Sequence, residues 1–292
     1  MKVRATQGRI LIIRHPDDPF DSAPYVIHVL AEQWRRGGLD VKVSCRVPRH
    51  VDKDVVVIPH LDLTRTPPEH QDFFSACPRI INRSVTDISK RRISNNLVRR
   101  TDTYDGPVIV KTDRNAGGDP EKLKLRSRGK LGQAILKIGW KLPWTITGLL
   151  NPGEYKIYEH PQCVPWEVWH NPRLVVEKFL PERQGDQYCL RQYVFLGDRE
   201  INTLAVSPDP LVKSWNVTRR EILSETPPEL REARKSLGFD FGKFDYVIRD
   251  GKAVLFDANR TPTYNAASAA GSPSQLLLDL SKGIESFCGV AA

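Results

Sequence analysis

The chain has 292 residues, of which 40% are hydrophobic and 27% are charged, a composition typical of a globular protein rather than a disordered or fibrous one. It contains no run of about 18 apolar residues and no signal-peptide core, so we expect neither a membrane span nor secretion, and the expected compartment is the cytosol. The net charge of +9 favours an anionic ligand, such as a nucleotide, an acidic metabolite or a nucleic acid. The five cysteines form no C-x-x-C pair, so a zinc site and a disulfide framework lack support.

Residues 1–85 are predicted to form an α/β layer. Short β-branched runs suited to buried parallel strands occur at residues 9–13, 41–45, 54–59 and 79–81. After the first run, apolar residues recur at helical spacing from Val26 to Trp34, and Gly37-Gly38 ends that helix. The loop from His15 to Asp21 follows the first strand, at the end of the sheet where open α/β folds bind ligands.

A basic helix is predicted after this layer. Thr86 or Asp87 can cap it, and it runs through Leu97 with Lys90 near its start. Other expected elements are strands over 173–179, 188–196, 244–249 and 253–258, and helices over 228–237 and 274–287.

A lysine is predicted to lie beside a glycine-containing loop. The apolar strand over 106–112 includes Lys111 near its end, and the small-residue loop over 113–119 contains Gly117 and Gly118. A lysine on a rigid strand beside backbone N–H donors can neutralise nucleotide phosphates. The alternative is a solvated lysine at a strand end, which is the commoner situation for a lysine taken alone.

The segment that begins at Glu177 is a strand that runs into a proline turn. Such an edge can offer backbone C=O and N–H groups to an adenine, with a carboxylate downstream for ribose hydroxyls. An ordinary strand exit is the alternative for this piece in isolation.

A hairpin is predicted around Asp250-Gly251, the strongest short-range turn signal in the chain. On a two-residue period Asp257 and Asn259 share one face, Phe256 points to the other, and Asp245 on the partner strand can join the oxygen-bearing face. Three oxygen ligands on rigid strands suit Mg²⁺, which completes its octahedron with water and nucleotide phosphates. A solvated strand face is the alternative.

In this order the motifs resemble those of the ATP-grasp superfamily, which includes glutathione synthetase, D-alanine:D-alanine ligase and the ribosomal-protein glutamate ligase. The specific part is the set of three motifs just described, and the likeness extends coarsely over the whole chain. It implies an α/β fold in which an N-terminal Rossmann-like layer precedes two lobes that enclose ATP. The corresponding domains are residues 1–85, 86–180 and 181–292.

The resemblance implies that several residues contact the nucleotide phosphates. Lys111 would bind them from its strand, and the loop with Gly117 and Gly118 would close over them. Lys90 matches a second nucleotide-contacting lysine of the family.

It also implies an adenosine site. Glu177, together with the backbone of Lys178 and Leu180, would bind adenine, and either Glu182 or Asp186 would bind the ribose.

The remaining implied roles concern the metal and the transferred group. Asp245, Asp257 and Asn259 match the positions that bind Mg²⁺, or Mn²⁺ in its place, and Arg191 resembles an arginine that faces the transferred phosphoryl group. The family usually has Glu where Asp257 stands, so the carboxylate here is one methylene shorter.

The implied activity is an ATP- and Mg²⁺-dependent carboxylate–amine ligase that acts on a small, anionic carboxylate and an amine through an acylphosphate. An ATP-grasp small-molecule kinase is the alternative with the same nucleotide site.

The alternative from another class is a nucleic-acid-binding protein without ATPase activity. It rests on the basic residues Lys122, Lys124, Arg126, Arg128 and Lys130, which would line one side of an extended chain. No stacking aromatics interleave with them, so a solvated, mobile flap is preferred, followed by a segment that guides an anionic substrate, and nucleic-acid binding comes third. The sequence leaves the substrates and the oligomeric state open.

Overall fold

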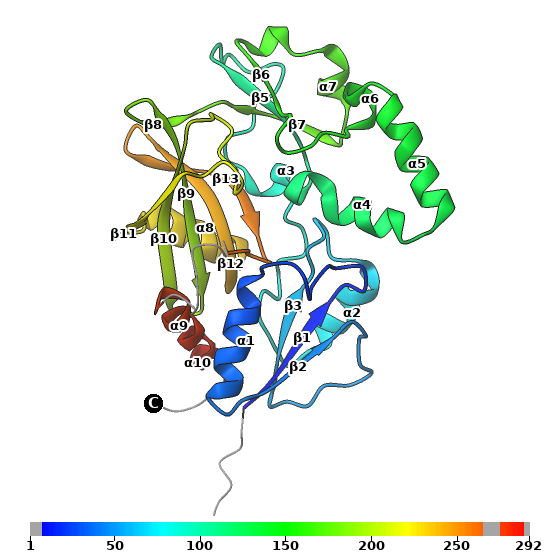
Figure 1. Ribbon diagram of the computed structural model, residues 1–292, viewed down its shortest axis with the longest axis vertical. Helices are drawn as coiled ribbons and strands as arrows, with labels where there is room; N and C mark the ends of the chain where they lie inside the picture. Colours follow the sequence, from blue (N-terminus) through cyan, green and yellow to red (C-terminus); the bar gives the residue numbers. More distant parts are fainter. Residues whose placement is uncertain (1–7, 265–274, 289–292) are drawn as a thin grey trace, which may run out of the picture.

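The computed structural model describes residues 8–264 and 275–288, which form three β-sheets and their flanking helices (Figure 1). The first sheet has the order β2-β1-β3-β4 with parallel neighbours, as its alternating strands and helices predict. Its strands are β1 (Arg9–Arg14), β2 (Asp40–Ser44), β3 (Val55–His60) and β4 (Arg79–Ile80), and its helices are α1 (Val26–Arg36) and α2 (Pro68–Ala76).

The second sheet is small and antiparallel, with the order β6-β5-β7. The central strand β5 is almost wholly buried except at Lys111, which is only partly covered. After β5 the chain turns through a 3-10 segment, and helices α4 and α5 extend away from the sheet (Figure 1). The elements are β5 (Val108–Thr112), β6 (Lys156–Tyr158), β7 (Leu174–Lys178), α4 (Asp119–Arg126), α5 (Lys130–Lys141), α6 (Trp144–Thr147) and α7 (Trp166–His170).

The third sheet has the order β11-β10-β9-β12-β13, with β8 paired to β9. Its strands are β8 (Glu182–Gln184), β9 (Gln187–Leu196), β10 (Arg199–Ser207), β11 (Arg219–Leu223), β12 (Phe241–Arg249) and β13 (Lys252–Asn259). The hairpin of β12 and β13 turns at Asp250 and Gly251 with φ of 51° and 75°, which confirms the predicted turn. One face of this sheet packs against α8 (Pro228–Leu237), which ends at Gly238 as predicted.

Three expected elements differ in the structure. The helix predicted to run through Leu97 is only the single turn α3 (Lys90–Ile93), because Asn95 and Asn96 leave the helix to hydrogen-bond Leu255 and Lys178. The basic residues 122–130 are not on an extended chain, which is the case in which they would line one side; they lie on α4, on the turn after it and at the start of α5. Asp119 and Glu121 in the first turn of α4, with a proline beside them, favour a helix start.

The helix predicted over 274–287 is interrupted. It consists of α9 (Gln275–Ser281), a 3-10 turn (Lys282–Ile284) and α10 (Glu285–Cys288), and the predicted first residue, Ser274, lies outside the described residues. This region packs between helix α1 of the first layer and strands β9 and β10 of the third sheet. The Trp34 indole N–H of α1 donates to the Ser281 carbonyl at 2.8 Å, and Leu280 joins the core around α1.

The three sheets fall one each within residues 1–85, 86–180 and 181–292. Because the C-terminal helices pack on α1, the division into three domains stays a prediction. Within residues 8–264 and 275–288, none of the helices combines the length and apolar character needed to cross a membrane.

Candidate nucleotide-binding site

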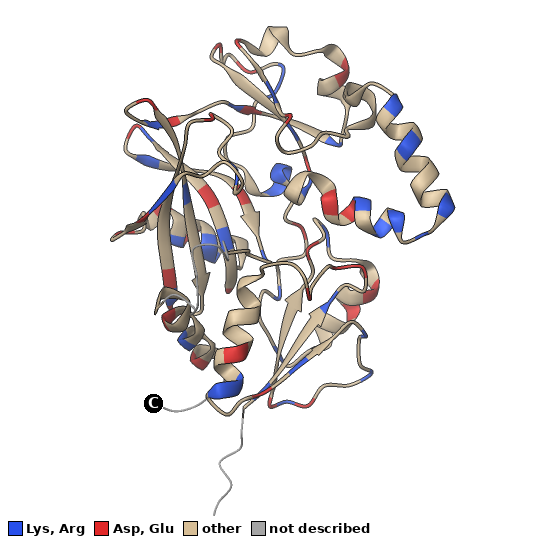
Figure 2. Ribbon diagram, in the orientation of Figure 1, with Lys and Arg blue, Asp and Glu red and all other residues tan. Residues whose placement is uncertain are grey.

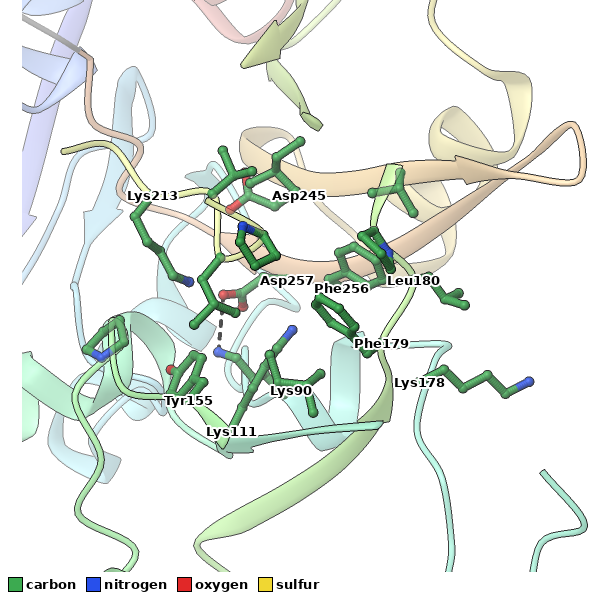
Figure 3. A pocket seen from close by; sticks show the side chains of 18 of the residues that line it. Lys90, Lys111, Tyr155, Lys178, Phe179, Leu180, Lys213, Asp245, Phe256 and Asp257 are labelled. Atoms are coloured by element: carbon green, nitrogen blue, oxygen red, sulfur yellow. Dashed lines mark hydrogen bonds and ion pairs between the residues drawn. The ribbon is translucent and has the colours of Figure 1, made fainter. Parts of the chain in front are cut away.

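A pocket lies between the β6-β5-β7 sheet and the face of the third sheet turned away from α8 (Figure 3). Segments far apart in the sequence form its walls: the start of α3, strand β5, the 3-10 turn after it, the linker after β7, the loop after β10, and the β12–β13 hairpin. Its lining residues include Lys90, Ile109, Lys111, Gly117, Lys178, Leu180, Leu211, Lys213, Asp245, Phe256 and Asp257.

Lys111 extends from β5 toward a fully buried carboxylate. Its ammonium lies 2.5 Å from Glu177 Oε2, and the exposed fractions of the two side chains are 14% and 0%. The ammonium also lies 5.1 Å from the centre of the Phe256 ring. Since Lys111 lines the pocket and Glu177 does not, Glu177 supports the lysine from behind rather than forming the pocket wall.

Lys90 is buried beside a second carboxylate. Its ammonium donates to Asp257 Oδ2 at 3.1 Å (Figure 3). It also donates to the Arg114 carbonyl at 2.9 Å. Burial alone would lower the pKa of Lys90, but the negative charge of Asp257, with smaller contributions from Tyr155 and Glu177, outweighs it and raises this pKa. Lys90 therefore stays charged in the pocket.

Lys213 approaches from the loop between β10 and β11, and its ammonium lies 5.1 Å from the centre of the Tyr155 ring. Burial, together with the neighbouring charges of Lys111 and Lys90, lowers the pKa of Lys213 to about 8. Three ammonium groups that converge in this way form a site for a polyanion, because an anion placed among them relieves their mutual repulsion.

Asp245 and Asp257 lie directly opposite each other on β12 and β13. Lys243 and Gln192 contact Asp245 Oδ1 at 3.2 Å and 3.0 Å, and Asp257 is paired with Lys90. The register shifts after this pair, so that Phe256 is an extra residue in β13. The predicted separation of Phe256 and Asp257 onto opposite faces is therefore wrong: this β-bulge directs both into the pocket.

Asn259 does not line the pocket; its side chain lies at the junction with the first sheet. Its side-chain oxygen accepts hydrogen bonds from the Thr261 N–H at 2.8 Å and the Thr261 hydroxyl at 2.9 Å. The same hydroxyl lies 2.7 Å from Asp62 Oδ1, and burial raises the pKa of Asp62 to about 7. The predicted metal ligand is thus linked to the edge of the first sheet.

A divalent cation fits the two aspartates. Asp257 Oδ1 is buried and meets no hydrogen-bond donor among the described residues, which leaves this oxygen available as a ligand. Within the described ranges there is no cluster of three or more His, Cys, Asp and Glu side chains able to bind a metal. A metal here would therefore take Asp245 and Asp257, with oxygens from water or phosphate, a set that Mg²⁺ accepts, whereas the Asn259 oxygen is occupied by Thr261.

The glycine loop lies at the pocket edge in a left-handed conformation. Ala116, Gly117 and Gly118 have φ of 45°, 66° and 77°. A Cβ on Gly117 would lie 2.6 Å from Pro152 Cγ, so this position requires glycine for space as well as for its backbone. The loop is also fastened to the first domain, because the Asn115 N–H donates to Thr64 Oγ1 at 3.0 Å.

The predicted adenine segment follows β7 along the pocket wall. Asn96 makes two hydrogen bonds with the backbone of Lys178. The Lys178 N–H donates to the Asn96 carbonyl at 3.0 Å, and the Asn96 side-chain amide donates to the Lys178 carbonyl at 2.7 Å. The Leu180 N–H makes no hydrogen bond within the described part of the chain, and Leu180 lines the pocket. Asn96 therefore fixes the segment, and Leu180 presents an unpaired donor.

The structure does not bring Arg191, Glu182 and Asp186 to the pocket. Arg191 lies on the opposite face of β9, where it makes a two-pronged ion pair with Glu182 at 2.7–3.0 Å. Glu182 Oε2 also accepts the Ile248 N–H at 3.0 Å, and Asp186 is exposed at the tip of the β8–β9 turn. Strand alternation directs Gln192 rather than Arg191 toward Asp245, so the pocket lining as it stands gives the predicted phosphoryl and ribose contacts no support, and they stay predictions.

Sequence reasoning missed two residues of the pocket lining, Lys213 and Tyr155, and Lys243, which contacts Asp245. Lys213 and Tyr155 lie in loops without periodicity, so no local pattern marks them. Lys243 could have been found, because it precedes Asp245 by two residues on the same strand and so shares its face.

No protein-family model matches the sequence, and a search of curated proteins found no match. Solved structures do match. The ATP-grasp ligase PsnB, solved with a minimal precursor, aligns with a TM-score of 0.50 at 11% identity over 90% of this chain and 94% of its own. A RiPP-associated ATP-grasp ligase from Chryseobacterium gregarium has a TM-score of 0.49 at 11% identity, covering 98% of each chain. A RimK domain ATP-grasp protein from Sphaerobacter thermophilus has a TM-score of 0.48 at 13% identity, covering 96% of this chain and 99% of its own.

The likeness to PsnB extends over nearly the full length of both chains and includes the two lobes that border the pocket. It agrees with the motif order Lys111, Glu177, Asp245 and Asp257 read from the sequence. The chain therefore has the ATP-grasp fold.

Proposed function

We propose that this protein is an ATP- and Mg²⁺-dependent ligase that joins a carboxylate to an amine. The observation that supports this most directly is the convergence of Lys90, Lys111 and Lys213 opposite Asp245 and Asp257 in one pocket. Cations for phosphate and carboxylates for a metal are the two requirements of an ATP–Mg²⁺ site. In the described part of the pocket no side chain is arranged as a nucleophile with its base, which favours a reaction between two bound substrates.

The nucleotide is proposed to lie with its phosphates at the lysines and its base near Leu180. Lys111 and Lys90 would bind phosphate oxygens, with the loop around Gly117 alongside. Ile109 and Phe256 supply apolar surface for the adenine, and the unpaired Leu180 N–H would donate to a ring nitrogen. Mg²⁺, or Mn²⁺, would be held by Asp245 and Asp257 and would neutralise phosphate charge.

The proposed reaction has two steps. A carboxylate oxygen of the first substrate attacks the γ-phosphorus of ATP, the bond to the bridging oxygen breaks, and ADP leaves with the electron pair. The amine nitrogen of the second substrate then attacks the acyl carbon, inorganic phosphate leaves, and the amine loses a proton. The lysines of the pocket contribute by positioning and charge neutralisation, which account for most of the catalysis in phosphoryl transfer.

The test is a screen for ADP release with amino acids, short peptides and anionic metabolites as paired substrates. Peptides are included because PsnB was solved with a precursor. A product with the summed mass of two substrates less one water supports the ligase, whereas a stable product with an added phosphoryl group would assign a kinase. Salt-dependent oligonucleotide binding without ADP release would place the protein in the nucleic-acid-binding class.

Binding of the nucleotide is tested separately from turnover. Mg²⁺-ATP at about 100 times its Kd should stabilise the fold by roughly 2.7 kcal/mol. The Asp245→Asn variant is the control, because it removes one metal ligand and leaves the lysines in place. An unfolding transition that saturating Mg²⁺-ATP does not move in the wild-type protein would contradict the proposed site.

A further inference from the structure

Helices α4, α5 and α6, residues 119–147, form an arm that projects from the second sheet (Figure 1). The arm has a strong excess of positive charge. Between Glu121 and Glu154 the sequence contains no acidic residue, and basic residues occur at 122, 124, 126, 128, 130, 137 and 141 (Figure 2). Nothing in the proposed ligase site uses this charge, because the arm contributes no lysine or arginine to the pocket lining.

The outer side of α5 presents a stripe of large apolar side chains to solvent. Leu131, Ile135 and Ile138 are 71%, 48% and 61% exposed, and Leu142, directly after the helix, is 52% exposed. Their spacing of four, three and four residues places them in one line on the helix surface. We call these four residues the apolar stripe.

The apolar stripe is not the side by which α5 packs on the protein. Gly132 and Leu136 are buried on the inner side, where a Cβ on Gly132 would lie 1.8 Å from the Leu125 carbonyl oxygen. Trp140 also points away from the stripe, since Lys122 lies over its ring at 5.3 Å. The inner face of the helix is thus already packed against the protein, and the apolar stripe is a separate surface that is exposed to solvent.

The spacing and the charge together indicate what would cover this line. Alternation of four and three residues is the pattern of a coiled-coil seam, which accepts one further helix. By helical geometry Lys130, Lys137 and Lys141 lie along one flank of the apolar stripe, so the covering helix should be acidic on that side. A second copy of this chain would oppose lysine to lysine, which disfavours self-association through the stripe.

A membrane surface fits less well. An interfacial helix has a broad apolar face, with aromatic residues on it. Here the line is one side chain wide, and Trp140 is turned toward Lys122. We propose that α5 is a docking site for an acidic amphipathic helix of a partner protein, with apolar residues at spacings of three and four and carboxylates along one edge.

The probe is a fluorescein-labelled helical peptide of three heptads with leucine at the a and d positions and glutamate at e and g. A second peptide has lysine in place of each glutamate. Fluorescence anisotropy should detect binding of the acidic peptide to the full-length protein, and binding should weaken as salt is raised. Ile135→Ser/Ile138→Ser should reduce this affinity by about tenfold or more, equivalent to about 1.4 kcal/mol.

The matched control is Ile157→Ser/Ile222→Ser, which removes two exposed isoleucines of similar exposure outside the arm. Its peptide affinity should stay within about twofold of wild type. All four positions are exposed, so thermal unfolding of both variants should resemble that of the wild-type protein. Because the arm lies outside the pocket, ATP binding should be equal in all three proteins, which separates this proposal from the proposed ligase activity.

The proposal is overturned if the basic peptide binds as well as the acidic one, or if the stripe variant binds the acidic peptide like wild type. Cosedimentation with phosphatidylglycerol vesicles provides the other comparison. Vesicle binding that is lost in the stripe variant, without binding of the acidic peptide, would assign the arm to an anionic membrane instead.

Discussion

The ion pair of Lys111 and Glu177 leads to a sharp prediction about folding. Glu177 is 0% exposed, its charged partner at 2.5 Å is Lys111, and apart from this ammonium neither carboxylate oxygen meets a hydrogen-bond donor within the described residues. Replacing Lys111 by methionine keeps the side-chain volume but leaves this carboxylate buried without its partner. Removing one member of a buried pair costs about 3–5 kcal/mol of folding free energy. We expect the lower end of that range, because Lys90 also interacts with the Glu177 charge.

Urea denaturation should therefore show Lys111→Met destabilised by about 3 kcal/mol. Glu177→Gln should cost less, because Lys111 lines the pocket and can be hydrated there. The double variant Lys111→Met/Glu177→Gln should recover most of the loss, since no unpaired charge stays buried, and the difference measures the coupling of the pair. Calorimetric titration should still find ATP binding impaired in the double variant. If Lys111→Met unfolds at the wild-type urea concentration, the pair does not stabilise the fold and this reasoning is refuted.

Three further predictions concern the pocket. The affinity for ATP should fall as pH rises through about 8, where Lys213 loses its proton, by at most about tenfold per pH unit. The affinity of the Lys213→Arg variant should change little over the same range, and equal pH profiles for both proteins would argue against a phosphate contact by Lys213. Asp245→Asn should lower turnover by a factor on the order of 10² while the far-ultraviolet circular dichroism spectrum stays the same. Turnover equal to that of the wild-type protein would mean that Asp245 is only a solvated residue of its strand. Gly117→Ala should lower the free energy of unfolding, measured in urea, by about 1–2 kcal/mol, because of the φ of 66° at this position and the close approach to Pro152. Gly185→Ala is the control for the backbone contribution alone, because Gly185 has a similar φ and open space around it.

Much of the local structure could be predicted from the sequence, because short-range interactions determine it. The Asp250-Gly251 turn needs two residues with positive φ, and the helix before Gly238 ends because glycine adopts the left-handed conformation without strain. The strand that carries Lys111 is recognisable from its β-branched run alone. Lys111, Asp245 and Asp257, which the motif resemblance assigned to one nucleotide and metal site, line one pocket, and their roles there stay predictions.

The remaining features were decided by tertiary contacts that no local pattern contains. The extra residue at Phe256 turned both Phe256 and Asp257 into the pocket, because the register of β13 against β12 shifts there. Arg191 faces Glu182 rather than the pocket, because successive side chains of β9 alternate between the face that packs on α8 and the face that borders the pocket. Lys213 reaches the site from an irregular loop, and α5 leaves the apolar stripe exposed although its spacing is that of a helix surface that packs on another helix. A sequence determines which side chains share a face, but only the packing of one element on another decides which face meets protein, ligand or solvent.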